Sequence, residues 1–207
     1  MDPLQESVSE VLRATGRQSP ELGGGAASIL AALVGVSLVR MAAATTHERG
    51  EQDMAGALKR LDGISERLEE LARADVEVFG RYVDALRLPR DTQRQEAVRS
   101  SALDETGHEA AETPLLAGIM IVEGIEVAAE IAPHAFPEVS SDVYAGAAIL
   151  SGAFFGALAT LEINLRPRRM ADRRDKFLRR KQEAHDRHSA AMDVVRRYAE
   201  EAGYHLS

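Results

Sequence analysis

Residues 19–39 read SPELGGGAASILAALVGVSLV, in which three consecutive glycines open a long stretch without charged side chains. Glycine has no Cβ atom and adopts positive φ readily, so the backbone of Gly23, Gly24 and Gly25 can approach a ligand closely. The first N–H groups of the helix that follows have no partners within it, and they favour an anion. This stretch predicts a ligand-binding turn at the start of a buried helix, or else a flexible loop beside a core helix.

The rest of the chain has the composition of closely packed helices. Only 4% of its 207 residues are aromatic, and alternating β-type patterns are hard to find. Hydrophobic periodicity predicts six helices, at about residues 4–15, 24–45, 51–86, 92–131, 140–165 and 172–202. Pro114 is expected to interrupt or restart the fourth, and Ser140, Ser141 and Asp142 to offer caps for the fifth. We therefore expect one all-α domain over residues 1–207, a multi-helical bundle of about six helices.

Composition and charge also limit the kinds of partner that the chain is expected to have. Two uncharged runs, 22–39 and 143–161, approach the length of a membrane span, but small residues dominate both, which favours buried helices. Residues 166–197 hold 12 basic and 5 acidic residues in a chain of net charge −8, without an aromatic platform for nucleic acid. That segment favours a solvated or dimer-facing helix. The start of the chain lacks a secretory pattern and there is no cysteine, so we expect a cytoplasmic protein.

Asp75 is the residue with the clearest chemical potential. It lies seven residues after Leu68 and four before Phe79, on the apolar stripe of the predicted third helix. Burial there would raise the pKa of the carboxyl group, which suits an acid/base catalyst near neutral pH. The same position suits equally well a buried aspartate that pairs with an arginine or caps a neighbouring helix.

Other candidate sites are better explained by structure. Asp142 fits a helix cap more readily than a catalytic role. His185 and His188 are three residues apart but lack a further ligand set, and Glu105 with His108 matches only half of a di-iron motif. Nucleophile, P-loop and dinucleotide signatures are also missing. We therefore expect neither a metal nor a cofactor.

A set of short motifs runs in order from residue 19 to residue 165. They are Ser19-Pro20, Gly23–Gly25, Asp75, Phe79, Ala85-Leu86, Leu88-Pro89, Pro114-Leu115, Ser141-Asp142, Gly156-Ala157 and Ile163-Asn164-Leu165. This ordered set resembles the cyclodeaminase/cyclohydrolase family, which includes the C-terminal domain of formiminotransferase-cyclodeaminase and stand-alone methenyltetrahydrofolate cyclohydrolases. The resemblance implies an all-α homodimer that holds folate near the glycine-rich turn, with Asp75 as the catalytic acid/base.

The resemblance also implies a reaction and a substrate site. The expected reaction is hydrolysis of 5,10-methenyltetrahydrofolate to 10-formyltetrahydrofolate, or the related formimino cyclodeamination. Its partners would be a small-molecule substrate and a second copy of the chain, with no nucleic acid and no membrane. The implied substrate-binding residues are Gly23, Gly24, Gly25, Thr46, Arg49, Ser141, Asp142, Thr160 and Asn164.

The chain departs from the family pattern at residues 44–51. The family usually carries a basic cluster there, whereas this chain has Glu48 and Glu51, which would repel the acidic tail of folate. A diverged member that acts on, or only binds, a non-folate amidine or imine is therefore an alternative. A metal-binding helical bundle is a third, more distant one.

Overall fold

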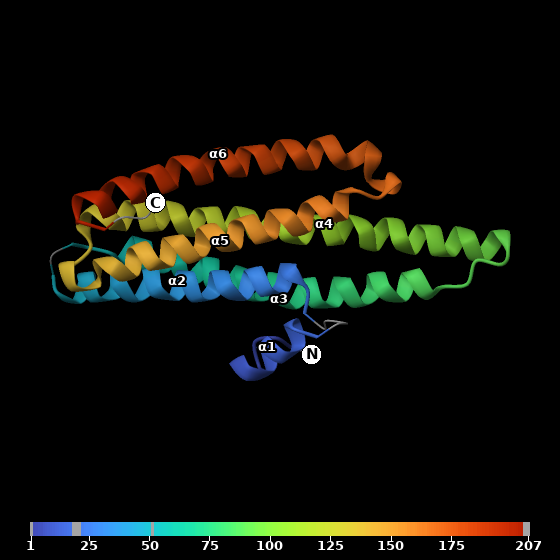
Figure 1. The fold of residues 1–207 in the computed structure, drawn as a ribbon, viewed down its shortest axis with the longest axis horizontal. Helices are drawn as coiled ribbons and strands as arrows, with labels where there is room; N and C mark the ends of the chain where they lie inside the picture. The colour runs from blue at the N-terminus through green and yellow to red at the C-terminus, as the bar shows by residue number, and fades with distance from the viewer. Residues whose placement is uncertain (1, 18–21, 51, 205–207) are drawn as a thin grey trace.

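The computed structural model describes residues 2–17, 22–50 and 52–204, and the regular structure in this part of the chain is helical, without strands (Figure 1). Its α-helices are α1 (Val8–Thr15), α2 (Gly24–Glu48), α3 (Ala55–Arg87), α4 (Gln93–Ile131), α5 (Ser140–Leu165) and α6 (Ala171–Glu201). Three 3₁₀ turns, η1 (Ala132–His134), η2 (Pro137–Val139) and η3 (Arg168–Met170), link the last three helices. The predicted all-α bundle of about six helices is confirmed. Ser19, Pro20 and Glu51 lie outside the described residues.

The five long helices lie side by side along the length of the molecule, and short α1 stands to one side of them (Figure 1). Helix α2 packs against α3 and α5, while α4 packs against α3, α5 and α6. The core between them is built from Leu, Ile, Val and many alanines. This arrangement brings the start of α2, the middle of α3 and the end of α5 to one region of the bundle.

Small residues let α2 and α5 approach until their backbones touch. A Cβ atom at Gly35 would lie 2.9 Å from the carbonyl oxygen of Gly146, and one at Gly146 would lie 2.8 Å from that of Gly35. By length and composition, both helices could cross a membrane. In this fold they pack against each other within the bundle, in agreement with the expected buried helices.

Pro114 does not interrupt its helix, contrary to expectation. Helix α4 runs unbroken from Gln93 to Ile131 with Pro114 inside it, and the side chain of Thr92 caps its start. A proline within a helix lacks the N–H that would bond to the carbonyl group four residues earlier. Here that carbonyl belongs to Ala110, and it has a replacement partner on α5.

The predicted cap by Ser140, Ser141 and Asp142 is wrong. The N-cap position of α5 is Val139, which makes no side-chain cap hydrogen bond. The turn η2 leads directly into α5, so the backbone is already helical when it reaches Ser141. Ser140 instead donates from Oγ to the carbonyl oxygen of Pro137, at 2.9 Å.

The basic face of α6 contacts acidic residues of the same chain. Arg180 pairs with Glu112 of α4 at 2.7 Å, and Arg187 pairs with Glu126 of α4 at 2.8 Å. One face of α6 also points inward, with Phe177, Ala184, His188, Ala191 and Val195 buried. Part of the positive charge in residues 166–197 is therefore matched within the bundle.

Candidate active site

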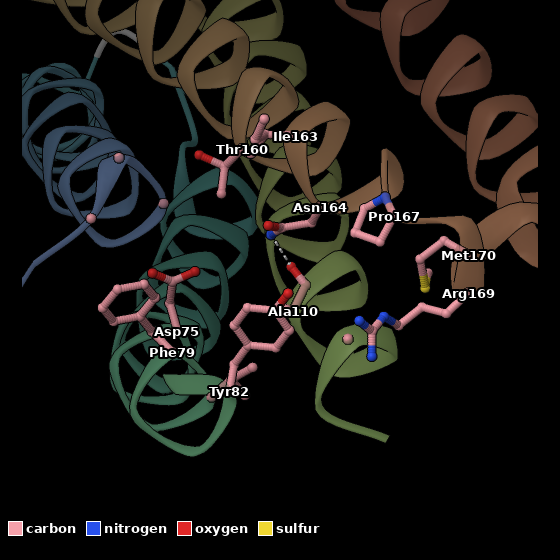
Figure 2. A pocket seen from close by; sticks show the side chains of 15 residues that line it. Asp75, Phe79, Tyr82, Ala110, Thr160, Ile163, Asn164, Pro167, Arg169 and Met170 are labelled. Carbon is pink, nitrogen blue, oxygen red and sulfur yellow. Dashed lines mark hydrogen bonds between the residues drawn. The ribbon is translucent and has the colours of Figure 1, made fainter. Parts of the chain in front are cut away.

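A pocket of about 360 Å³ opens where α2 begins and α5 ends (Figure 2). Helix α3 forms one side of it, α4 closes its back, and η3 borders the far side. The lining is largely apolar, with few polar groups, as in many small-molecule sites. The lining residues are Gly23, Gly24, Gly25, Asp75, Val78, Phe79, Tyr82, Gly107, Ala110, Thr160, Ile163, Asn164, Pro167, Arg169 and Met170.

Asp75 projects from α3 onto the first turn of α2. A Cβ atom at Gly25 would lie 2.8 Å from the carboxyl carbon of Asp75, closer than real Cβ contacts permit. The missing side chain of Gly25 therefore makes room for the carboxylate of Asp75. The sequence suggested that this glycine lets the backbone approach a ligand, whereas here it admits a catalytic candidate from a neighbouring helix.

The carboxylate of Asp75 also caps α2. The N-cap residue Gly23 has no side chain to offer, and the backbone N–H of Ala26 donates to Asp75 instead. Burial raises the pKa of Asp75 above its ordinary value of 3.8, and the hydrogen bond from Ala26 opposes that rise only in part. The helix-capping alternative is thus observed, and it leaves a partly buried carboxylate facing the pocket.

Thr160 and Asn164, one turn apart on α5, form the wall facing Asp75 (Figure 2). The Thr160 hydroxyl donates to the carbonyl oxygen of Gly156, at 3.2 Å. Its oxygen lies 3.5 Å from the point where a Cβ atom of Gly24 would be, an ordinary contact distance. The expected neighbours Gly23, Gly24, Gly25, Asp75, Thr160 and Asn164 are therefore brought together.

Asn164 is the replacement partner for the helix bond that Pro114 removes. Its Nδ2 donates to the carbonyl oxygen of Ala110 at 2.6 Å, and Ala110 is the residue whose carbonyl Pro114 leaves without a helical donor. An oxygen could not bond to that carbonyl, so the contact fixes which end of the Asn164 amide faces Ala110. One side chain thus ties α5 to α4 beside the pocket and is held in a single orientation.

Two aromatic residues in the pocket were not among the predicted substrate-binding residues. Phe79 is 46% exposed and, with Tyr82, lies along the pocket side of α3 (Figure 2). Tyr82 follows Asp75 by seven residues, two helical turns, so its position could have been found from the sequence. The sequence placed Phe79 on the apolar stripe of this helix, whereas in the structure Val78 is buried and Phe79 is exposed.

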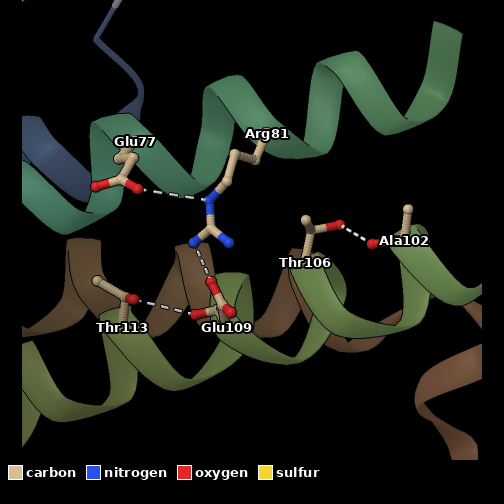
Figure 3. A network of polar contacts seen from close by, with 6 residues as sticks. All are labelled: Glu77, Arg81, Ala102, Thr106, Glu109 and Thr113. Atoms are coloured by element: carbon tan, nitrogen blue, oxygen red, sulfur yellow. Dashed lines mark hydrogen bonds and ion pairs between the residues drawn. The ribbon is translucent and has the colours of Figure 1, made fainter. Parts of the chain in front are cut away.

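A polar network beside the pocket holds α3 to α4 (Figure 3). Arg81 of α3 donates to the carboxylate of Glu109, and its Nε lies 3.7 Å from Glu77. Thr113 donates to the carbonyl oxygen of Glu109 at 3.0 Å. Arg81 lies next to Tyr82 in the chain, and Glu109 lies next to Ala110. These contacts therefore help to hold together the two pocket walls that α3 and α4 form.

Four of the predicted substrate-binding residues lie at the opposite end of the bundle. Thr46 accepts a hydrogen bond from the N–H of Phe136 at 3.0 Å, and the guanidinium of Arg49 lies 5.0 Å from the centre of the Phe136 ring. Ser141 and Asp142 belong to the first turn of α5, about 30 Å of helix away from Thr160. A single chain does not bring them to the pocket, and their role in substrate binding stays a prediction.

The metal candidates are also separated or otherwise engaged. Among residues 2–17, 22–50 and 52–204, no three His, Asp or Glu side chains are grouped to hold a metal ion. His188 is buried, bonds through Nε2 to Ser151 Oγ at 2.9 Å, and stacks on Phe154. His108 lies edge-on to Phe177. These histidines therefore have packing roles.

Comparison with known proteins identifies relatives over most of the chain. The model of a family described as formiminotransferase-cyclodeaminase matches residues 7–185. A methenyltetrahydrofolate cyclohydrolase from Methylorubrum extorquens is 27% identical over 173 residues, which cover 81% of this chain and 82% of that protein. The formimidoyltransferase-cyclodeaminase of Gallus gallus is 26% identical over 168 residues, covering 79% of this chain but 31% of its own length.

A solved structure has the same fold. The crystal structure of formiminotetrahydrofolate cyclodeaminase from Thermotoga maritima superposes with a TM-score of 0.85, covering 97% of this chain and 99% of that one. The sequence identity is 19%, so this similarity establishes the fold alone.

Proposed function

Because the chain belongs to the formiminotransferase-cyclodeaminase family, we propose that it is a folate one-carbon enzyme that hydrolyses 5,10-methenyltetrahydrofolate to 10-formyltetrahydrofolate. The observation that carries this proposal is the carboxylate of Asp75, which sits over Gly25 in a largely apolar pocket. Hydrolysis is preferred to cyclodeamination because the cyclohydrolase relative matches over most of its own length. The proposal includes the homodimer implied by the family resemblance.

Asp75 would act as base and then as acid in this reaction. Water attacks the cationic methenyl carbon that bridges N5 and N10, and the Asp75 carboxylate accepts one proton from that water. The same negative charge stabilises the cationic carbon in the water-poor pocket. The bond from this carbon to N5 then breaks, and Asp75 returns its proton to N5. The second proton of the water leaves to solvent as the formyl C=O bond forms.

The remaining pocket residues would position the substrate. Phe79 and Tyr82 offer aromatic surface to the planar parts of a folate. Thr160 and Asn164 lie across from Asp75 and supply polar groups in fixed orientations. Such positioning matters because a small misplacement of the reacting atoms can cost a large part of the rate.

The decisive assay follows loss of methenyltetrahydrofolate absorbance with purified protein. We expect Asp75→Asn to lower kcat by roughly 10²- to 10⁴-fold, the usual contribution of a positioned acid/base. Asp84→Asn is the matched control, since Asp84 is an exposed residue of the same helix outside this pocket. A wild-type rate no faster than buffer would reject the proposed hydrolysis.

Two further measurements separate the alternatives. Ammonia release from formiminotetrahydrofolate, without methenyl hydrolysis, would establish a cyclodeaminase that uses the same pocket. If neither reaction occurs, thermal shift with non-folate amidines tests the diverged-binder alternative, because a ligand at 100 times its Kd adds about 2.7 kcal/mol of stability.

A further inference from the structure

Arg169 is the positively charged residue in the pocket lining. Asp75 and Arg169 are the charged residues among the described lining residues, and they project from different elements, α3 and η3. Figure 2 shows them on opposite sides of the pocket, with Tyr82 and Asn164 between them. The pocket therefore has a negative end and a positive end separated by aromatic and apolar surface.

We propose that Arg169 binds a carboxylate of the glutamyl tail of the substrate, at the end of the pocket opposite the reacting carbon. This inference rests on the proposed folate activity. A methenyltetrahydrofolate in this pocket would place its cationic carbon near Asp75 and its aromatic aminobenzoyl group beside Tyr82. Its anionic tail would then extend toward Arg169.

The guanidinium of Arg169 is unengaged within the described chain. No hydrogen bond or ion pair joins it to residues 2–17, 22–50 or 52–204. Some cations of α6 are paired, but Arg168 beside it also has no partner among the described residues, so its place in the pocket lining is what sets Arg169 apart. Arg180 pairs with Glu112 and Lys181 with Glu162. A guanidinium is always charged and presents several donors suited to a carboxylate. Arg169 therefore keeps its donors available for a ligand.

The turn that carries Arg169 is fixed on both sides. Met170, the next residue, is 1% exposed and belongs to the core. Arg174 donates from Nη2 to the carbonyl oxygen of Leu165 at 2.8 Å, which ties α6 to the end of α5. The Cδ atom of Arg169 lies 3.6 Å from the point where a Cβ atom of Gly107 would be, so its side chain passes close to α4. The fold thus fixes the position of the Arg169 side chain at the edge of the pocket.

A single arginine also implies a preference for how many glutamates of the folate tail contribute to binding. The basic cluster that the family usually carries is missing at residues 44–51. The described part of that region, residues 44–50, lies at the far end of α2 from this pocket. One guanidinium can hold one carboxylate group in a bidentate pair. We expect the first glutamate of a folate to contribute strongly to binding and additional glutamates to contribute little.

The test compares Arg169→Gln with Arg168→Gln, which removes an equal charge from the same turn but outside the pocket lining. Calorimetry would measure binding of tetrahydrofolate and of tetrahydropteroate, which lacks the glutamate. Wild type should bind tetrahydrofolate roughly 10-fold more tightly than tetrahydropteroate, as expected for a charge-assisted hydrogen bond. Arg169→Gln should abolish that difference and Arg168→Gln should retain it.

Two results would overturn the inference: equal binding of both probes by wild type, or equal effects of the two arginine variants. In turnover, Arg169→Gln should raise KM for methenyltetrahydrofolate roughly 10-fold and leave kcat within about twofold, since the contact is uniform binding. If wild type lacks turnover but discriminates the probes through Arg169, the proposed reaction fails and the anion site stands.

Discussion

The two ends of the α2–α5 pair differ although the same helices form both. At one end, α2 begins and α5 terminates, and a pocket lies between Gly25, Asp75 and Asn164. At the other end, about 37 Å away along a 25-residue α2, Thr46 bonds to the backbone of Phe136 and Arg49 covers its ring. Within one chain, the first end leaves polar side chains facing an open pocket. The second end is filled by contacts among its own residues.

The polarity of a helix explains part of this difference. The start of α2 exposes N–H groups, and it receives the carboxylate of Asp75. The end of α2 exposes carbonyl groups, and it carries Arg49 at its C-cap, where a cation is favourable. Asp75 and Arg49 therefore both complement α2, but only Asp75 also faces a cavity.

The largest expected effect in the glycine turn is at Gly25. Gly25→Ala forces the carboxylate of Asp75 to move, so we expect kcat to fall roughly 10- to 100-fold. Gly24→Ala should cost much less, because its Cβ atom would meet Thr160 Oγ1 at an ordinary 3.5 Å. Steady-state kinetics of both variants, after thermal unfolding confirms that they fold, checks this order. Equal activity of the two would show that Asp75 does not need the space at Gly25.

The pairing of Asn164 with the proline gap can be tested through stability. Asn164→Ala should destabilise the protein by about 1–3 kcal/mol, because the carbonyl of Ala110 loses its donor. Pro114→Ala restores a backbone N–H to that carbonyl. In that background, the cost of Asn164→Ala should fall by about 1 kcal/mol or more, measured by urea unfolding of all four proteins. Strictly additive effects would contradict the pairing.

These contacts show which parts of the site the sequence could predict. Apolar periodicity predicted the helices and the position of Asp75 on the inward side of α3, because periodicity is a local property of the chain. The unbroken helix at Pro114 could not be predicted, since its compensation comes from Asn164, fifty residues later. Arg169 could not be selected from a run of arginines without knowing which one borders the pocket. The order of motifs also says nothing about which helix ends meet.

The far end should respond weakly to substitution. If a single chain forms the whole site, Arg49→Gln and Asp142→Asn should each change kcat and KM by about twofold at most, in line with surface changes away from a site. A tenfold loss of kcat/KM in either variant would contradict the view that the two ends are functionally separate. It would show that these residues reach the pocket of a second copy, which analytical ultracentrifugation and mixing of inactive variants could then examine.

The most direct test of the central claim is the pH dependence of kcat/KM for methenyltetrahydrofolate hydrolysis, corrected for the buffer rate. Burial raises the pKa of Asp75 above 3.8, and a general base must be ionised to act. Activity of wild type should therefore fall as pH drops through this raised pKa, and the residual rate of Asp75→Asn should lack that fall. Wild-type activity in Asp75→Asn, or the same acid limb in both proteins, would contradict the account.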